Sequence, residues 1–279
     1  MSAKIIDGRK IAEKIRENIK KEVAELKTVP SITTIKIGDD PQSNLYLKLR
    51  NKACHEVGIK STVLELQKDI AEKEIIDSIK HLNNDKNVHG IMVQFPLPGH
   101  VNPERIIREI DPRKDVEGLT PYNMGETLSG NEQIIPVTPL SVLTILDHEK
   151  TQLKGKDIVV VNHSNIVGKP LSVLLLNRNA TVSICHVYTK NLKDYTSKAE
   201  IIISAVGVPK LITKDHVKKD AFIIDVGIVK TTDGICGDVD FDSVKETAGK
   251  ITPVPGGVGP VTVACSLINM LKTYRLCVE

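Results

Sequence analysis

The chain has 279 residues, and its 41% share of hydrophobic residues is enough to build the cores of two α/β domains of ordinary size. The 38 basic and 35 acidic side chains leave a formal charge of +3 and are mixed along the sequence, so no surface for nucleic acid or membranes is indicated. With no Trp and three Phe, the chain also has few aromatic platforms on which nucleic-acid bases stack.

The cysteines and the amino terminus indicate a reducing compartment. The five cysteines show no C-x-x-C spacing, so neither a disulfide framework nor a zinc site is predicted. The first residues are charged throughout and contain no apolar signal segment, while the longest apolar runs are the size of strands. We therefore expect a cytoplasmic protein that is neither secreted nor membrane-spanning.

Helical and extended patterns alternate in the first half of the chain. Helices are expected over residues 8–27, 43–57 and 70–82, and extended runs over 32–37, 62–66 and 90–95. This alternation predicts βαβ units and a parallel sheet. A segment rich in Pro, Gly, Asn and Asp follows over residues 95–130, and turn chemistry this dense indicates a functional loop or a domain boundary.

The expected helix 43–57 carries the first two candidate site residues. Its apolar positions recur every four residues, at Leu45, Leu49, Ala53 and Val57. Tyr46 and Arg50 stand one turn apart, beside that stripe rather than in it. Two interpretations are open: a solvated basic flank of an amphipathic helix, or a chemical pair that faces a site.

The second half has the pattern of a doubly wound sheet. Thr138 and Pro139 predict the start of a helix, as its cap and its first residue. Short apolar runs, typical of strands buried on both faces, occupy residues 157–161, 180–187, 199–207 and 221–228. A final helix follows residue 262, and we expect it to pack back on the first domain.

Residues 157–176 read as strand, turn and helix, which is the pattern of a dinucleotide site. Asn162 stands where the first Gly of G-x-G-x-x-G would be, an exchange made tolerable because Asn adopts left-handed conformations readily, and Gly168 permits close approach. No acidic residue ends the next strand, where an NAD site has one, whereas His163, His186 and Lys190 offer positive or donating groups. This favours NADP, and an ordinary strand–turn–helix with exposed histidines is the alternative.

Two loops rich in Pro or Gly are further candidates. The run PVPGGVGPVT at residues 253–262 directly precedes the final helix, so its backbone must be tightly shaped and approachable. In VQFPLP at residues 93–98, Gln94 follows a strand and could present its amide to a ligand. A rigid structural turn is the alternative interpretation of each loop.

Together these segments resemble the bifunctional methylenetetrahydrofolate dehydrogenase/methenyltetrahydrofolate cyclohydrolase family, known as FolD. The segments that carry the resemblance follow in order along nearly the whole chain: KIIDGRKIA, IGDDPQSNLY, NKACHEVGI, GIMVQFPLP, KDVEGLTPYNMG, HSNIVGKP, SAVG, IDVGI, GDV and TPVPGGVGPVT. The resemblance implies oxidation of 5,10-methylenetetrahydrofolate by NADP⁺, then hydrolysis of the methenyl product to 10-formyltetrahydrofolate. It implies no metal.

The resemblance also implies a two-domain α/β enzyme. A folate-binding domain would comprise residues 1–136 and 261–279, and a Rossmann-type NADP-binding domain with a doubly wound parallel sheet would comprise residues 137–260. The family places the folate cleft between the two domains and forms homodimers. The implied partner is therefore a small tetrahydrofolate derivative, together with a second copy of the chain.

Three sets of site residues carry over from the family motifs. The catalytic set is Tyr46, Arg50, Gln94 and Glu117. The substrate-binding set is Val93, Phe95, Pro255, Gly256, Gly257, Val258 and Gly259. The cofactor-binding set is Asn162, His163, Ser164, Thr189, Gly207 and Ile228.

Two catalytic positions depart from the family pattern, because Arg50 replaces a Lys and Glu117 replaces an Asp. Lys can lose its proton in a desolvated site but Arg cannot, so we predict that the dehydrogenase is retained and the cyclohydrolase is weakened or rearranged. Glu117 keeps the carboxylate for the pterin but carries it one methylene farther. A modified pterin is therefore an alternative substrate.

The cofactor motifs depart as well, since the family's G-R-S and C-H-S-[KR]-T read N-H-S and C-H-V-Y-T here. NAD is accordingly the alternative to NADP. Three alternative functions remain open: a monofunctional NAD(P)-dependent methylenetetrahydrofolate dehydrogenase, another two-domain nicotinamide dehydrogenase acting for instance on amino acids, and a catalytically idle nucleotide-binding module.

Overall fold

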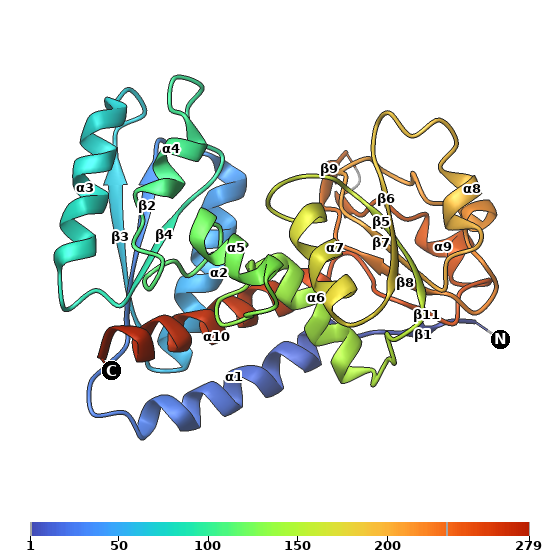
Figure 1. Ribbon diagram of the computed structural model, residues 1–279, viewed down its shortest axis with the longest axis horizontal. Coiled ribbons are helices and arrows are strands. Elements are labelled where there is room, and N and C mark those ends of the chain that lie inside the picture. The colour runs from blue at the N-terminus through green and yellow to red at the C-terminus, as the bar shows by residue number, and fades with distance from the viewer. Residues whose placement is uncertain (1, 233, 279) are drawn as a thin grey trace. The chain divides into compact units, whose positions relative to one another are not determined.

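The computed structural model describes residues 2–232 and 234–278, without the side chains of residues 41–43. They form two compact units: unit 1 comprises residues 2–12 and 138–262, and unit 2 comprises residues 13–137 and 263–278. Each unit has its own parallel sheet flanked by helices (Figure 1), so the predicted two-part α/β fold is confirmed.

The first residues belong to unit 1, although we expected them in the folate-binding domain. Strand β1 (Lys4–Ile5) pairs with β11 (Lys250–Ile251), and this pairing draws the amino terminus into the large sheet. Helices α1 (Gly8–Ala24) and α10 (Val258–Val278) each start in unit 1 and continue into unit 2. The third boundary falls between Val137 and Thr138, at the start of helix α6 (Val137–His148), so the chain passes between the units within helices.

Unit 1 is built on a six-stranded sheet whose pairs are all parallel, in the order β1-β11-β8-β7-β5-β6. Four of these strands correspond to the apolar runs in the sequence: β5 (Asp157–Val161), β6 (Thr181–Cys185), β7 (Ile201–Ser204) and β8 (Phe222–Asp225). Strand β5 pairs with β6 on one side and β7 on the other, so the winding reverses at β5. Ligands of doubly wound sheets bind at the carboxyl ends of strands near such a reversal.

Short helices and one hairpin complete unit 1. They are α6 (Val137–His148), α7 (Gly168–Asn177), α8 (Lys193–Thr196), the 3₁₀ turn η1 (Lys214–His216), α9 (Phe241–Val244) and the antiparallel strands β9 (Val229–Thr231) and β10 (Gly234–Cys236). Helix α7 packs against β5 and β6 (Figure 1). Helix α6 begins at Val137, so the prediction that Thr138 caps it is wrong: Thr138 already has helical backbone.

Unit 2 has a three-stranded parallel sheet in the order β3-β2-β4. Its elements are β2 (Ser31–Ile37), α2 (Pro41–Glu56), β3 (Lys60–Leu66), α3 (Glu72–Asn84), β4 (Gly90–Val93), α4 (Pro103–Arg108) and α5 (Pro121–Leu128). Strand β4 ends two residues earlier than expected, and Gln94 therefore lies in the loop that follows it.

Side chains alternate along β2 and β4, so the two faces of this sheet pack against different helices. Ile35 and Ile91 belong to a core cluster with Ile75 and Ile79 of α3. Met92 points the other way, into a core shared by α1, α2 and α10. Thr34 is paired with Met92 across the two strands and lies on this second face. A side chain from α2 can therefore meet Thr34 and Met92 together.

Helix α2 does not bury the face that its leucines predict. Leu45 and Leu49 are 53% and 50% exposed, while Leu47 and Cys54 are buried and Arg50 is 0% exposed. The burial that the four-residue repeat predicts is confirmed for Ala53 and Val57 but is wrong for Leu45 and Leu49, in the first turns of the helix. Arg50 occupies an inward position where an apolar residue is usual, and there it contacts the sulfur of Met92 and the hydroxyl of Thr34.

Helix α10 has the length and apolar composition of a membrane span, but it is a core helix of this fold. Val263, Leu267 and Met270 are buried in the unit 2 core beside Met92. Core helices of globular proteins pass the same composition test. The expectation that the final helix packs on the first domain is confirmed.

Candidate active site

Arg50 is the most unusual residue of unit 2, because a complete guanidinium lies in the core. Its Nη1 donates to the sulfur of Met92 and its Nη2 donates to Oγ1 of Thr34. Its Nε has no hydrogen-bond partner, and no carboxylate lies within ion-pair distance in the described part of the chain. A buried cation without a carboxylate partner is costly, so this arrangement indicates a ligand or water that completes it.

Tyr46 lies one turn before Arg50 and packs against the same core. The guanidinium carbon of Arg50 is 5.9 Å from the centre of the Tyr46 ring, which is within the range of cation–π attraction. Burial raises the pKa of the Tyr46 hydroxyl, Glu117 raises it further, and Arg50 opposes both effects. The phenol therefore stays protonated at neutral pH and can donate a hydrogen bond but not accept a proton. Tyr46 and Arg50 are thus neighbours, not a solvated flank.

Gln94 follows strand β4, and its backbone N–H still continues the sheet by donating to the carbonyl of Ile35 at 2.9 Å. The side-chain Nε2 donates to the carbonyl of Phe95 at 3.0 Å. The side-chain Oε1 is buried and has no partner. Since buried amide oxygens are almost always hydrogen-bonded in native proteins, Oε1 is an acceptor available to a bound donor.

Glu117 lies in a loop that its neighbours hold in place. The Asp115 carboxylate accepts the backbone N–H groups of Gly118 and Thr120, at 2.9 and 2.8 Å, and an N–H of Asn123 at 3.0 Å. Gly118 has φ of +69°, and a Cβ there would lie 2.6 Å from the carbonyl carbon of Ile135. The loop conformation is therefore fixed by Asp115 and Gly118, which leaves the Glu117 side chain free for another role.

The Glu117 carboxylate accepts no hydrogen bond within the described residues. It lines a small, mostly apolar pocket whose other walls include Val93, Phe95, Ile107 and Ile110. Burial raises the pKa of Glu117 to about 7, the positive charge of Arg50 opposes that rise, and Asp115 adds to it. The pocket has room for little more than a water molecule. Glu117 is therefore a half-buried acid that changes charge near neutral pH.

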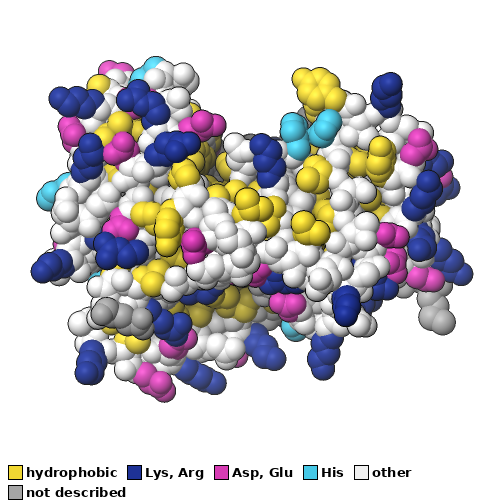
Figure 2. Space-filling view, viewed as in Figure 1, with side chains coloured by type: hydrophobic (Ala, Val, Ile, Leu, Met, Phe, Trp, Pro, Cys, Tyr) yellow, Lys and Arg dark blue, Asp and Glu magenta, His cyan; other side chains and the backbone are white. Residues whose placement is uncertain are grey.

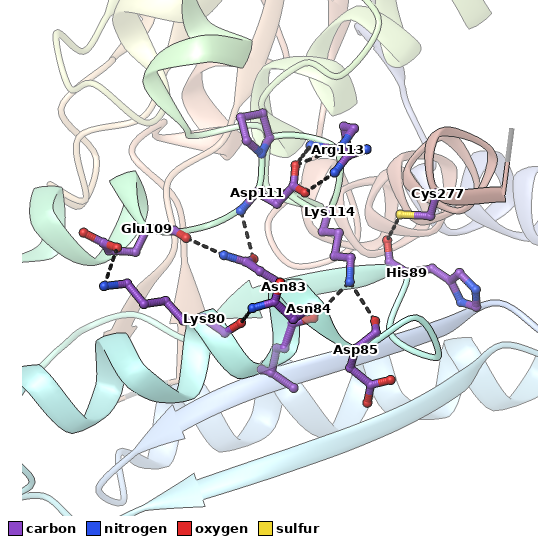
Figure 3. A network of polar contacts seen from close by, with 12 residues as sticks. Lys80, Asn83, Asn84, Asp85, His89, Glu109, Asp111, Arg113, Lys114 and Cys277 are labelled. Atoms are coloured by element: carbon purple, nitrogen blue, oxygen red, sulfur yellow. Dashed lines mark hydrogen bonds and ion pairs between the residues drawn. The ribbon is translucent and has the colours of Figure 1, made fainter.

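A polar network anchors the segment that precedes this loop (Figure 3). The Lys114 Nζ donates to the backbone carbonyls of Leu82 and Asp85, at 2.9 and 2.8 Å, at the end of helix α3. The backbone N–H of Asp111 donates to Oδ1 of Asn83 at 3.0 Å, so the segment is tied to α3 at a second point. Lys114 is 6% exposed. This buried lysine positions the following residues, among them Asp115 and Glu117.

The loop of residues 255–259, which we expected to bind substrate, lies in unit 1. The local structure requires glycine at two positions of this loop. Gly256 has φ of +108°, and a Cβ on Gly257 would lie 2.5 Å from the carbonyl oxygen of Pro253. The loop is also joined to α1, because the Gly8 N–H donates to the Gly256 carbonyl at 2.9 Å. Val258 begins α10, and Pro255 is exposed. A Cβ on Gly259 would meet nothing within 4 Å, so only this glycine leaves open space above its backbone.

Asn162 shapes the turn after β5 with its side chain, and the left-handed conformation that we expected is not used. Its Oδ1 accepts the N–H groups of Ser164 and Gly168, at 2.7 and 3.0 Å, and its Nδ2 donates to the carbonyl of Ala205 after β7. A Cβ on Gly168 would lie 2.1 Å from the Asn162 carbonyl oxygen. Asn162 and Gly168 are therefore in close contact in the turn after β5, which leads directly into the N-terminus of α7.

Imidazole rings meet at the ends of β5 and β6. The rings of His163 and His186 are 4.9 Å apart, and the exposed ring of Tyr188 lies 5.9 Å from that of His186. Figure 2 shows two adjacent histidines at the surface with hydrophobic side chains beside them. Thr189 closes this turn, because its Oγ1 accepts the His186 N–H at 2.9 Å.

Two buried aspartates that sequence reasoning did not select hold the loops that carry the candidates Gly207 and Ile228. The Asp238 carboxylate accepts from the Ser204 hydroxyl and from the N–H groups of Val206 and Val208, at 2.8, 2.7 and 3.0 Å. The Asp225 carboxylate accepts from the N–H groups of Gly227, Asp238 and Val239. Burial raises the pKa of Asp225 to about 7, and Asp238 adds to the rise. An Asp that ends a buried strand, as in IIDVG, was the signal available in the sequence.

The loops that these aspartates hold fit a dinucleotide. Gly207 has φ of +71°, and a Cβ there would meet no atom within 4 Å. Ile228, which follows β8, is 66% exposed and offers apolar contact for an aromatic ring. Together with the turn at Ser164, these groups form an open backbone edge at the carboxyl ends of the strands. No group of three or more His, Cys, Asp or Glu side chains in residues 2–232 and 234–278 could hold a metal ion.

The candidate residues are therefore distributed over the two units. Unit 2 brings together Tyr46, Arg50 and Glu117 with the β4 end, Val93, Gln94 and Phe95. Unit 1 carries the glycine loop of residues 255–259 and the six cofactor candidates.

Comparisons with known proteins agree with this organisation. A family model described as the catalytic domain of tetrahydrofolate dehydrogenase/cyclohydrolase matches residues 6–117, and the NAD(P)-binding domain of the same family matches residues 136–277. The bifunctional protein FolD of Nautilia profundicola is 49% identical over 275 residues, covering 97% of either chain.

Solved structures give the same result. The bifunctional enzyme FolD from Campylobacter jejuni has a TM-score of 0.96 and 43% identity, covering 98% of this chain and 99% of that chain. The Trypanosoma brucei FolD, solved with NADP and an inhibitor, has a TM-score of 0.94 and 34% identity, covering 99% and 98%. This chain therefore belongs to the tetrahydrofolate dehydrogenase/cyclohydrolase family.

Proposed function

We propose that this chain oxidises 5,10-methylenetetrahydrofolate to the 5,10-methenyl cation with NADP⁺ and then hydrolyses the cation to 10-formyltetrahydrofolate. The observation that carries the proposal is a pair of buried polar atoms around the end of β4 that no protein atom satisfies, Arg50 Nε and Gln94 Oε1; the half-buried Glu117 lines a pocket with residues of β4. Each buried unsatisfied group costs about 1–3 kcal/mol, so a polar ligand is expected to complete them. A pterin, with ring N–H, amino and carbonyl groups, has the complementary donors and acceptors.

In the dehydrogenase reaction we assign binding roles to these residues. The ionised Glu117 accepts hydrogen bonds from the amino and ring N–H groups of the pterin, and Gln94 presents its amide oxygen to a donor. Tyr46, which stays protonated, donates a hydrogen bond. Bound NADP⁺ would supply the acceptor for the hydride that leaves the methylene carbon. Correct positioning is sufficient for such a step, and the change from Lys to Arg at residue 50 does not impair it.

In the hydrolysis the fixed charge of Arg50 has a different use. A guanidinium keeps its proton in proteins, so Arg50 orients water and stabilises negative charge that develops on the attacking oxygen. It cannot accept the proton that the water must lose. We therefore propose that, in the hydrolysis, residue 50 stabilises charge but does not accept the proton, unlike a lysine at the same position.

NADP is the cofactor, and the turn at Asn162, His163 and Ser164 is proposed to hold its phosphates and ribose. The absence of an acidic residue at the end of β6 leaves room for a 2′-phosphate, and the His163–His186 pair offers donors for it. Thr189, Gly207 and Ile228 complete the proposed contacts. NAD remains the alternative cofactor for the same turn.

We further propose that the protein is a cytoplasmic homodimer. The resemblance of the sequence to the FolD family motivates this proposal. Sedimentation of the purified protein at micromolar concentration should give twice the 30.6 kDa of one chain. A mass of one chain at that concentration would contradict the dimer.

One assay tests the proposed function and its alternatives. The purified protein is incubated with methylenetetrahydrofolate and either NADP⁺ or NAD⁺, and the reduced nicotinamide and the methenyl chromophore are followed separately. We expect reduction of NADP⁺ and loss of the chromophore faster than in buffer. Reduction without enzymatic loss of the chromophore would indicate a monofunctional dehydrogenase. No reduction of either cofactor would rule out the dehydrogenase.

A further inference from the structure

Asn269 places an amide group in the apolar core of unit 2. It belongs to helix α10, is 0% exposed and directly precedes Met270 of that core. Its Nδ2 donates to the backbone carbonyl of Val116 at 2.9 Å and to that of Ile135 at 2.8 Å. An amide nitrogen carries two hydrogens, so this one side chain serves both carbonyls. Burying an amide costs free energy unless it is hydrogen-bonded, so the place of these two carbonyls shows what Asn269 does.

The two carbonyls belong to irregular segments that lie against each other at Glu117. Val116 directly precedes Glu117, and the backbone N–H of Val137 donates to the Glu117 carbonyl at 3.3 Å. A Cβ on Gly118 would lie 2.6 Å from the carbonyl carbon of Ile135, so the two backbones are also in contact just after Glu117. The Asn269 amide therefore joins, from α10, the two segments that hold the Glu117 backbone between them.

Asn269 differs from the group that shapes this loop from within. The Asp115 carboxylate accepts N–H groups of the loop itself. Val116, in contrast, is tied to elements outside the loop: its N–H donates to the carbonyl of Ile91 in β4 at 3.3 Å, and its carbonyl accepts from Asn269. A misplacement of about 1 Å can cost a factor of about a hundred in an enzyme, so this anchoring matters for where the Glu117 carboxylate lies.

We propose that Asn269 is a positioning residue for the folate substrate, because its two hydrogen bonds fix the backbone from which Glu117 reaches the pterin. The inference rests on the proposed function, in which the Glu117 carboxylate accepts the pterin N–H groups. Asn269 is 0% exposed, so it acts through Glu117 and not on the substrate. Without its bridge the carboxylate is presented to the pterin in many positions. Folate binding then weakens, while the chemistry of bound folate changes less.

The first test is Asn269→Leu, which removes both donors at nearly constant volume. Thr273→Val is the matched control, because Thr273 is also 0% exposed on α10 and its hydroxyl donates to the Met270 carbonyl of the same helix at 2.9 Å. In Asn269→Leu we expect KM for both folates to rise at least about tenfold, with KM for NADP⁺ and the turnover number per folded protein within about threefold of wild type. Thr273→Val should leave every KM within about twofold. A structural role alone would lower the amount of folded enzyme and leave every KM of Asn269→Leu unchanged, which would overturn the proposal.

A double-mutant cycle tests whether Asn269 acts through Glu117. It uses Asn269→Ser, which keeps one hydroxyl donor and also provides the test if the leucine variant does not fold. Asn269→Ser should raise KM for both folates at least about threefold when Glu117 is present, and less than about 1.5-fold in the Glu117→Ala background. A rise of equal size in both backgrounds, or no rise with Glu117 present, would overturn the proposal.

The same assays separate this inference from the proposed function. If the wild type reduced neither NADP⁺ nor NAD⁺, the proposed function would be refuted, and the role of Asn269 with it. An active wild type whose folate KM did not respond to either substitution at residue 269 would refute the role of Asn269 alone.

Discussion

The end of strand β4 and the turn after strand β5 use their polar side chains in opposite ways. Around β4, Arg50 Nε and Gln94 Oε1 are buried without partners, and Glu117 accepts no hydrogen bond. Around β5, the side chains of Asn162 and Asp238 each satisfy three groups of the protein. The polar side chains around β4 are thus available to hydrogen-bond a ligand, whereas those around β5 hydrogen-bond the protein and fix the conformation of its loops.

This difference indicates where each region can change. The side chain of Arg50 bonds only to other side chains, so its exchange for a residue with other acid–base chemistry leaves no backbone group without a partner. In the β5 region a similar exchange would release buried N–H groups and alter the loops. We therefore expect substitutions near β4 to change reaction rates, and substitutions near β5 to change stability and cofactor binding.

The largest effect is expected for Asp238→Ala, which would leave the N–H groups of Val206 and Val208 and the Ser204 hydroxyl without an acceptor. Three buried donors without partners should lower the free energy of unfolding by about 4 kcal/mol. Urea unfolding measures this loss, and calorimetry measures the accompanying weaker binding of NADP⁺. Asp240→Ala is the control two residues away and should cost less than about 1 kcal/mol. Equal losses in the two variants would contradict the role of Asp238.

The pH dependence of stability provides the next contrast. Because the folded-state pKa of Glu117 is raised from 4.5 to about 7, the folded protein holds this proton more tightly than the unfolded chain does. The resulting stability is fully present below pH 4.5 and is lost as the pH rises to about 7, by up to about 3 kcal/mol.

Glu117→Gln removes that loss. The variant should therefore gain stability relative to wild type between pH 4.5 and pH 8, as measured by urea unfolding at both pH values. The control is Glu104→Gln, at an exposed position of α4, which should show no such change. A difference between Glu117→Gln and wild type that stays constant with pH would show that Glu117 has an ordinary pKa.

Arg50→Lys sharpens the contrast between the two reactions. A lysine at this buried position can lose its proton, so it supplies a proton acceptor that Arg50 does not, whereas binding of the substrate is little changed. We expect hydrolysis to rise by roughly tenfold relative to NADP⁺ reduction, which corresponds to about 1.4 kcal/mol in activation free energy. Parallel assays of both rates check this, and equal effects on the two reactions would contradict it.

The smallest effect is expected for His163→Ala. This imidazole lies beside His186 and is proposed to donate to the 2′-phosphate, so its loss should weaken NADP⁺ binding by about threefold to tenfold and leave NAD⁺ binding unchanged. Calorimetric titration with each dinucleotide measures the ratio. His148→Ala, on the surface of α6, is the control. If both dinucleotides bound more weakly to the same extent, His163 would have no role in discrimination.

Much of the fold was predictable, since the apolar runs of unit 1 correspond to β5 to β8 and the alternation in the first half corresponds to β2, β3 and β4. The burial of Arg50 was not predictable from periodicity, because a charged residue on the inward face contradicts the leucine pattern that defines that face. Only the positions of Thr34 and Met92 on the neighbouring strands explain it.

The turn after β5 was predictable in location, but the hydrogen bonds that shape it were not. Strand, turn and helix identified the turn, but the side-chain hydrogen bonds of Asn162 depend on Ala205, which lies on another strand's loop. The roles of Asp225 and Asp238 likewise depend on N–H groups that the sheet topology brings together. Long-range contacts of this kind leave no periodic signal in the chain.

The most direct test of the account is a crystal structure with bound 5,10-methenyltetrahydrofolate or a stable folate analogue. The account predicts that the pterin lies at the end of β4, with a donor within hydrogen-bond distance of Gln94 Oε1 and pterin N–H groups on the Glu117 carboxylate. A folate bound elsewhere, with both of these acceptors still lacking a ligand atom, would contradict the assignment of this region as the active site.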